Sequence, residues 1–416
     1  MLATETLALN ETTTLLDGYL SVRNTTTEIC RPLTIEDQAV QPCAEVSPPK
    51  WHLGHTSWFF EELILVRFMP EYQRCNEQYR LLFNSYYKSA GEHMLQGERG
   101  NLSRPTVAEV MAYRAHVDHY MTLLLQSDIH EPEMEALLEI GLHHEQQHQE
   151  LLYMDIKYIL GVNPLQVVYN ESVLPKAVAP SNENPWKNVE EGIYQLGHSG
   201  GGFAYDNESP RHKSYIYPFA IARNTVTNGE YLQFINDQGY GKARYWLSMG
   251  WDWLTESQVK HPLYWVQEAG VWYEFTLHGR QALDLNAPVT HISYFEADAF
   301  ARWQGGRLPT EQEFEIYLQQ DEFQQGLIKR RYHPNDTREN VGQVWCWTRS
   351  QYMAYPGFKP YQGLLEEYNG KFMCNQFVLK GGCVATPAGH YRHSYRNFYQ
   401  AHQQWMFSGI RLCKDI

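Results

Sequence analysis

The sequence lacks the features that mark secreted, membrane-spanning and zinc-knuckle proteins. No apolar run is long enough to cross a bilayer, and residues 1–6 lack the basic, then apolar pattern of a signal peptide. The 7 cysteines among 416 residues are scattered and form no C-x-x-C pair, a usage typical of reduced thiols. We therefore expect a cytoplasmic protein with no membrane partner.

Positive charge is also scarce. The formal net charge is −14, and the 34 lysines and arginines form no basic cluster of the kind that neutralises phosphates. This composition argues against a nucleic-acid partner. Apolar residues make up 43% of the chain and aromatic residues 14%, and the length is sufficient for two globular domains, each with its own core.

Helical patterns dominate residues 1–174. Their starts are marked by prolines and, for the third helix, by Ser103 as the cap with Pro105 in the first turn. The patterns predict four helices, over residues 5–23, 49–68, 105–126 and 132–161. Four helices of this length are typical of a four-helix bundle.

The character of the sequence changes after this region. Residues 175–187 are polar and rich in proline, which indicates a linker. In residues 188–416, short apolar runs are broken by Gly, Asn, Asp and Pro, with isolated helical patterns at 227–237 and 294–303. This pattern predicts a second domain of irregular α+β structure.

Two histidines are spaced to share a metal ion. His144 and His148 lie four residues apart in the last predicted helix, so both imidazoles project from one face, one turn apart. Neutral imidazoles in this arrangement can hold one metal between them. The alternative is a pair of histidines on a partly exposed helix without a metal, since exposed histidines are common.

Residues 144–148 also match the H-E-x-x-H signature of zinc proteases, in which Glu145 would be the general base. The extended signature needs glycine and histidine where Leu151 and Met154 stand. A thermolysin-like site needs a glutamate on a following helix, whereas Glu171 falls in a predicted loop. These departures argue against a protease.

A third histidine ligand is available in the second predicted helix. His52 and His55 both lie near its start, after Pro48 and Pro49, and periodicity does not choose between them. A three-histidine site leaves coordination positions open, as a catalytic metal needs. Neutral nitrogen ligands suit Zn(II) and Fe(II) about equally, so spacing does not identify the metal.

Motifs in both halves resemble known families. In the second half, motifs lie at residues 225–231, 288–293, 305–311, 344–348, 379–382 and 408–412. In these motifs and their order, the second half is similar to the formylglycine-generating-enzyme and sulfatase-modifying-factor family, which has a C-type-lectin-like fold. Through residues 51–55 and 144–148, the first half resembles DinB-like bundles.

The two halves in this order resemble one family, the ergothioneine-biosynthesis sulfoxide synthases (EgtB). Its members bind non-haem Fe(II) through three histidines and use O2 to join imidazole C2 of hercynine (Nα-trimethylhistidine) to the sulfur of cysteine or γ-glutamylcysteine. The resemblance implies the same metal and substrates here. It places the metal on His55, His144 and His148, and it implies that Gln147 contacts the hercynine imidazole.

The resemblance also implies a catalytic tyrosine. One subgroup places tyrosines of an N-S-Y-Y run beside the iron, and residues 84–87 make Tyr86 and Tyr87 our candidates for the catalytic acid. Ordinary packing of two adjacent tyrosines is the alternative. Other members take their tyrosine from the C-terminal domain, where Tyr352 is the nearest match and our second choice.

Further residues are candidates for substrate contacts. Phe59 stands where one branch of the family has a second glutamine, and its ring either holds the trimethylammonium group by cation–π attraction or packs in the core. Substrate carboxylates need basic partners, and our candidates are Arg396 first, then Arg392 and Arg411. Cys346 replaces the acidic residue usual in the family's W-x-W-T motif, and we assign it no function.

Three other functions stay open. The same scaffold serves related enzymes that form selenoneine, or that attach sulfur at imidazole C5 on the route to ovothiol. Formylglycine generation needs a cysteine pair near the Gly-Gly motif, but Cys383 has no close partner in sequence and Thr386 occupies the neighbourhood. A non-catalytic lectin-like binding module, the third alternative, predicts no metal.

Overall fold

The computed structural model describes residues 14–85, 87, 91–127, 131–180, 185–320, 332–339 and 341–416. The chain forms two compact units. The first contains Met1–Tyr169 and a later segment, Tyr361–Tyr368, and the second contains Asn170–Pro360 and Asn369–Ile416. Our predicted boundaries assumed a single crossing from one domain to the next and did not include the later segment in the helical unit.

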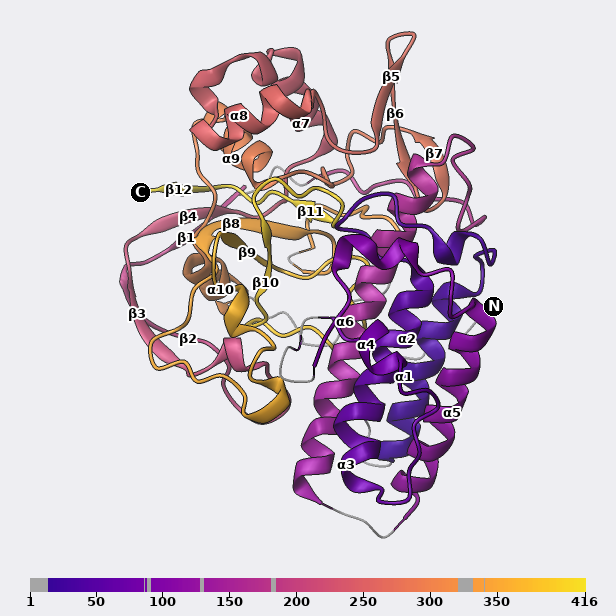
Figure 1. Ribbon diagram of the computed structural model, residues 1–416. Coiled ribbons are helices and arrows are strands. Elements are labelled where there is room, and N and C mark those ends of the chain that lie inside the picture. Colours follow the sequence, from indigo (N-terminus) through magenta and orange to yellow (C-terminus); the bar gives the residue numbers. More distant parts are fainter. Residues whose placement is uncertain are drawn as a thin grey trace. The chain divides into compact units, whose positions relative to one another are not determined.

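The first unit is a helical bundle. Its long helices lie side by side (Figure 1): α1 (Leu15–Cys30), α2 (Pro49–Phe60), α5 (Val107–Leu125) and α6 (Pro132–Val162). The π turn η2 (Glu61–Leu65) and the short helix α3 (Val66–Phe68) continue α2. Short helices in the connections are η1 (Asp37–Ala39), α4 (Tyr79–Leu82) and η4 (Gln96–Asn101), and η8 (Gly363–Leu365) lies in the later segment. The predicted helical bundle is confirmed.

The predicted end of the first helix was wrong. We expected it to end at residue 23, and the threonines that follow are poor helix formers. In the structure α1 continues to Cys30, since the hydroxyls of Thr25, Thr26 and Thr27 donate to carbonyls four residues back and the side chains of Thr26 and Ile29 are buried. The predicted start at residues 5–13 lies outside the described residues.

The predicted cap of the third long helix was also wrong. Helix α5 begins at Val107, and its cap is Thr106 rather than Ser103. The Thr106 hydroxyl accepts from the Glu109 N–H, and the Glu109 carboxylate accepts from the Thr106 N–H. This reciprocal capping box satisfies two backbone donors that Ser103 is too far away to reach.

The second unit mixes helices with small sheets, which confirms the predicted α+β structure. Its largest sheet has the order β10-β9-β8-β11, and smaller sheets have the orders β1-β4-β12, β5-β6-β7 and β2-β3. The strands are β1 (Trp186–Val189), β2 (Gly192–Leu196), β3 (His212–Ile216), β4 (Phe219–Ala222), β5 (Trp265–Glu268), β6 (Val271–Thr276), β7 (Gly279–Ala282), β8 (Trp345–Gln351), β9 (Gln376–Lys380), β10 (Asn397–Gln400), β11 (Ser408–Gly409) and β12 (Cys413–Asp415).

Helices of the second unit follow recognisable capping signals. Both predicted helical patterns are confirmed, as α7 (Asn228–Asn236) and α9 (Tyr294–Trp303), and each starts with a capping box. The remaining helices are α8 (Ser248–Ser257), α10 (Glu311–Gln320), η5 (Asp206–Glu208), η6 (Gly239–Gly241), η7 (Ala243–Tyr245) and η9 (Gly370–Phe372). No helix in the described ranges is both long and apolar enough to span a membrane.

Candidate metal centre

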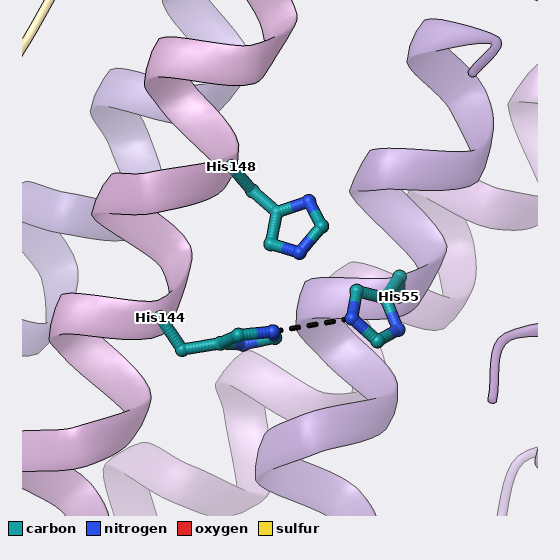
Figure 2. Close-up of side chains that lie close together, drawn as sticks. All are labelled: His55, His144 and His148. Atoms are coloured by element: carbon teal, nitrogen blue, oxygen red, sulfur yellow. Dashed lines mark hydrogen bonds between the residues drawn. The ribbon is translucent and has the colours of Figure 1, made fainter. Parts of the chain in front are cut away.

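Helices α2 and α6 bring three histidines together inside the first unit. His55 projects from α2, and His144 and His148 project from α6 into the same space (Figure 2). One ligand nitrogen from each ring lies within 4.8 Å of the other two, and all three side chains are buried. The pair predicted from helical spacing therefore faces one of the two candidate third histidines.

The donor set fits a metal ion. Two nitrogens bound at about 2.1 Å and at right angles to each other are about 3 Å apart, and His55 Nε2 lies 3.1 Å from His144 Nε2. Burial lowers the pKa of all three imidazoles, to about 3 for His144, and the neighbouring histidines lower those of His55 and His148 further. The rings are therefore neutral, which is the state that ligates metals.

Aromatic rings fix the orientation of these histidines. Trp51 stacks on His55 with ring centroids 4.6 Å apart, and Trp58 stacks on the same imidazole at 5.6 Å. Phe59 is fully buried and stacks on His144 at 4.5 Å. Because one face of its ring is used in this stack, the contact favours a packing role for Phe59.

A backbone carbonyl sets the tautomer of His55. Its Nδ1 lies 2.6 Å from the carbonyl oxygen of Phe83, which only accepts, so Nδ1 carries the proton and Nε2 is left to bind a metal. The approach of Phe83 depends on Gly54, because a Cβ at that position would lie 2.2 Å from the Phe83 ring. The glycine before the ligand is therefore part of the construction of the site.

His52, the alternative third ligand, lies behind the cluster rather than in it. Its Nδ1 is 2.8 Å from Nδ1 of His148, and its Nε2 is 2.9 Å from Oδ2 of Asp155. Both of its ring nitrogens are thus occupied by neighbours. Tertiary contacts make the choice that helical periodicity left open.

Glu145 of the H-E-x-x-H motif is turned away from the histidines. Its carboxylate lies 2.9 Å from Arg23, 2.5 Å from Arg114 and 2.6 Å from the Thr26 hydroxyl, and it is fully buried. Burial raises the pKa of Glu145, but the two guanidinium groups outweigh that effect and hold it at about 2. A carboxylate so firmly ionised and paired is a structural anchor, not the general base of a protease.

Gln147 lies on the histidine face and is held by a tyrosine that our sequence analysis missed. The Tyr368 hydroxyl donates to Gln147 Oε1 at 2.7 Å, and the Tyr368 ring centroid is 6.0 Å from that of His144. Tyr368 is buried and belongs to the segment Tyr361–Tyr368 of the helical unit. No local sequence pattern could have revealed it, because it follows Gln147 by 221 residues.

The two candidate tyrosines near residue 85 have different outcomes. Tyr86 lies outside the described residues. Tyr87 is buried, and its ring stacks on Trp58 at 5.5 Å, one ring removed from His55. The Asn84 side chain accepts from the Tyr87 N–H at 3.0 Å and donates to its carbonyl at 2.9 Å, which fixes the backbone there.

The candidate arginines all lie in the second unit and are buried. Arg392 pairs with Glu208 and Arg396 pairs with Glu311. Arg411 donates to the carbonyls of residues 222 and 223 at 2.8 and 2.5 Å. Each guanidinium group is therefore engaged inside this unit.

Tyr352 and Cys346 are also buried in the second unit. The Tyr352 hydroxyl accepts from Asn207 at 2.8 Å, and its ring stacks on Phe398 at 3.9 Å. Burial raises the pKa of the Cys346 thiol to about 11, partly offset by Arg411. Cys383 is buried as well, and the Thr386 hydroxyl lies 3.7 Å from its sulfur.

Two known families match parts of the chain, one in each unit. The DinB superfamily matches residues 19–152, and the sulfatase-modifying factor enzyme 1-like domain matches residues 182–339. The protein thus joins a DinB-like helical domain to a domain of the sulfatase-modifying-factor type, with a C-type-lectin-like fold. The fold implied by the motifs is confirmed.

Curated relatives carry related names. The chain is 33% identical over 243 residues to the hercynine oxygenase of Mycobacterium tuberculosis, covering 51% of this chain and 56% of that protein. It is 31% identical over 249 residues to that of Mycolicibacterium thermoresistibile, covering 51% and 54%. It is 30% identical over 234 residues to ergothioneine biosynthesis protein 1 of Schizosaccharomyces pombe, covering 51% and 28%. The chain spans about half the length of the hercynine oxygenases that it matches.

Proposed function

We propose that this protein is a non-haem Fe(II)- and O2-dependent enzyme that joins imidazole C2 of hercynine to the sulfur of cysteine or γ-glutamylcysteine. One observation carries the proposal. Three buried, neutral imidazoles converge beside Gln147, in a chain similar to proteins named hercynine oxygenase and ergothioneine biosynthesis protein 1. Metal, substrate and reaction are all part of the proposal.

His55, His144 and His148 would hold the metal. When bound there, Fe(II) would supply the activation of O2 and a common anchor for the two substrates, because three protein ligands leave positions open. The rings of Trp51 and Phe59, packed on these ligands, keep water from the imidazole faces and hold the donor nitrogens in place.

Gln147 would orient hercynine. Its Oε1 accepts from the Tyr368 hydroxyl, so the amide carbonyl is turned toward Tyr368 and the amide N–H groups would contact an acceptor such as the substrate imidazole nitrogen. Tyr368 therefore fixes which end of the amide faces the substrate. Without this hydrogen bond the amide could turn over and present an acceptor instead.

A tyrosine hydroxyl would donate the proton that the reaction needs. Tyr86 and Tyr87 remain our candidates, and the structure adds Tyr368, whose ring lies beside His144. Tyr352 remains our second choice; it is buried in the second unit, where its hydroxyl accepts from Asn207 and its ring stacks on Phe398. Replacing each tyrosine by phenylalanine, and comparing product formation under single-turnover conditions, identifies the donor.

The remaining candidates for substrate contacts have partners that support structural roles. Arg392, Arg396 and Arg411 would have to exchange partners to bind a substrate carboxylate. Phe59 would contact the trimethylammonium group only with the face that His144 leaves open. We retain these four as proposed contacts that binding measurements with hercynine and with each thiol will separate.

The decisive experiment is reconstitution with Fe(II) without oxygen, followed by oxygen consumption with hercynine and either thiol. Mass spectrometry of the product should find the hercynine–thiol sulfoxide with the unaltered protein and not with His144→Ala. His119→Ala, which removes an exposed histidine from α5, is the matched control and should retain activity.

The other outcomes are equally informative. Metal binding without oxygen uptake on either thiol would contradict the proposed reaction and favour a selenium donor or C5 attachment on the same scaffold. Absence of metal binding would overturn the proposal altogether and favour a binding module. Activity retained in His144→Ala would show that the histidine cluster is not the active site.

A further inference from the structure

A chain of buried hydrogen bonds runs from a carboxylate to one of the candidate metal ligands. Asp155 Oδ2 lies 2.9 Å from His52 Nε2, and His52 Nδ1 lies 2.8 Å from His148 Nδ1. All three side chains are buried, and all three residues belong to helices α2 and α6. The chain ends at the face of His148 opposite to the nitrogen that points into the cluster.

The first link has only one possible direction. The backbone N–H of Ser47 donates to the same Oδ2 of Asp155 at 2.9 Å, so this oxygen is an acceptor. His52 Nε2 must therefore carry the proton that is shared with Asp155. An imidazole that carries its single proton on Nε2 presents a bare Nδ1 to its other neighbour.

The second link follows from the first. Because His52 Nδ1 accepts, His148 Nδ1 must donate, and His148 holds its proton there. The lone pair of His148 is consequently on Nε2, the nitrogen that points toward His55 and His144 (Figure 2). In the opposite tautomer, His148 would carry a proton where a metal has to bind.

We propose that His52 and Asp155 are positioning residues that fix the tautomer and ring orientation of His148 for metal binding. This rests on the proposed function in so far as the three histidines hold the metal. The negative carboxylate at the end of the chain also strengthens the donor nitrogen of His148, as carboxylate–histidine pairs do at other metal sites.

The other two histidines have weaker support. His55 donates to a neutral backbone carbonyl. Nδ1 of His144 has no hydrogen-bond partner among the described residues, and its ring is held by the stack on Phe59. His148 is thus the ligand whose orientation and donor strength depend on a charged group. Removing the support of His148 should therefore lower metal affinity more than removing the support of either other histidine.

The test is metal affinity rather than turnover. Binding of Fe(II) and of Co(II) is measured without oxygen by competition with a coloured chelator, and the Co(II) absorption spectrum reports ligand geometry. His52→Leu should weaken binding about 10- to 100-fold, the range typical of a lost ligand-orienting partner, and should change the Co(II) spectrum. His278→Leu, which removes a buried histidine from the second unit, is the matched control and should change neither.

Asp155→Asn separates orientation from charge. The amide oxygen can still accept from Ser47 and His52, so the tautomer is kept, and binding should weaken less than 10-fold, below the range expected for a lost ligand-orienting partner. Asp155→Leu breaks the chain and should match His52→Leu. The double variant His52→Leu/Asp155→Leu should bind no more weakly than His52→Leu alone, because both changes cut the same chain.

Each outcome decides the proposal. Binding by His52→Leu within twofold of the unaltered protein overturns it, and so do additive losses in the double variant. If His52→Leu does not fold, the metal affinities of Asp155→Leu and Asp155→Asn are compared instead. Equal affinities of these two variants would contradict the proposed chain of hydrogen bonds. An unaltered protein that binds metal but forms no product refutes only the proposed reaction, whereas one that binds no metal refutes both proposals.

Discussion

Buried polar side chains have different kinds of partner in the second unit and in the histidine cluster of the first unit. In the second unit cations meet anions, in the pairs Arg392–Glu208, Arg396–Glu311 and Lys380–Glu315. In the cluster, three neutral rings point their nitrogens at one another, and the carboxylate of Asp155 is joined to them through His52 rather than paired with a cation there. Paired charges are a stable end state, whereas converging lone pairs become favourable only when something binds between them.

Helix α6 contains both kinds of environment within two consecutive residues. Glu145 is paired with Arg23 and Arg114, and its neighbour His144 faces the cluster. The two side chains leave the helix in different directions, so a motif that reads as one functional unit in the sequence is divided between a scaffold and a site. Whether a side chain is paired with an opposite charge, more than its residue type, distinguishes the scaffold from the site.

Breaking a pair in the second unit should have the largest effect on stability. Arg396→Ala leaves Glu311 buried without its cation and removes donors from the carbonyls of Asn207 and Met353. We expect a loss of about 3–5 kcal/mol in the free energy of unfolding, measured with urea. Arg349→Ala, an exposed arginine of β8, should cost less than about 0.5 kcal/mol.

The same variant separates scaffold from site. If Arg396 instead holds a substrate carboxylate, its replacement should leave the unfolding free energy close to that of the unaltered protein and raise KM for that substrate. Normal stability with a raised KM would therefore contradict our comparison and restore Arg396 as a substrate contact.

Crowding the histidine cluster should have an intermediate effect. In Gly54→Ala, the new Cβ would meet the Phe83 ring at 2.2 Å, and moving Phe83 would shift the carbonyl that orients His55. We expect a loss of about 1–3 kcal/mol in stability, as for other overpacked cores, together with weaker Fe(II) binding in the competition assay.

Gly18→Ala is the matched control for that prediction. Gly18 lies in α1, and a Cβ there would meet nothing within 4 Å. The change should stabilise the helix by up to about 1 kcal/mol and leave metal affinity unaltered. Unchanged metal binding in Gly54→Ala would show that the close approach of Phe83 is not needed for the site.

The sequence predicted those features that depend on local signals. The prolines at the starts of α2 and α6, and the spacing of His144 and His148, are local, and the structure has the helices and the pair where they were expected. The end of α1 was missed because its threonines are unfavourable locally, whereas the burial of Thr26 and Ile29 in the bundle is recorded by no local pattern.

The rest of the candidate site depends on contacts between distant segments. His52 and His55 have different roles because they have different partners. His52 contacts Asp155, 103 residues away in the chain, and His55 contacts the carbonyl of Phe83, 28 residues away. Tyr368 reaches Gln147 from 221 residues away. Periodicity describes one element at a time, so it could nominate these histidines but could not assign their partners.

Acidification should weaken the Arg392–Glu208 pair of the second unit, with a smaller effect on stability than the substitutions above. Burial raises the pKa of Glu208, but Arg392 and Ser394 outweigh it, so the folded-state pKa is below the ordinary value. The pair therefore stabilises the fold above the unfolded pKa of about 4.3, and this contribution is lost as the pH falls through the folded pKa. Glu208→Gln should be less stable than the unaltered protein at pH 7 but should lose less stability between pH 5 and pH 3.

Thermal unfolding across that pH range provides the measurement, with Glu256→Gln, an exposed glutamate of α8, as the control. The control should follow the unaltered protein at every pH. Parallel curves for Glu208→Gln and the unaltered protein would mean that Glu208 is not held ionised by its partners.

The reactivity of the cysteine thiols tests whether the interior of the second unit is only a scaffold, and it does so without a substitution. Cys75 and Cys374 are exposed, whereas Cys346 is buried in β8 with its pKa raised to about 11 by burial. Because the thiolate is the reactive form, brief treatment with iodoacetamide at pH 8 should label the two exposed cysteines and leave Cys346 unmodified until urea unfolds the protein. Mass spectrometry of the digested protein measures each site. Rapid labelling of Cys346 in the folded state would place an accessible, activated thiol inside the second unit, and that unit would then have to be regarded as a reactive site as well as a scaffold.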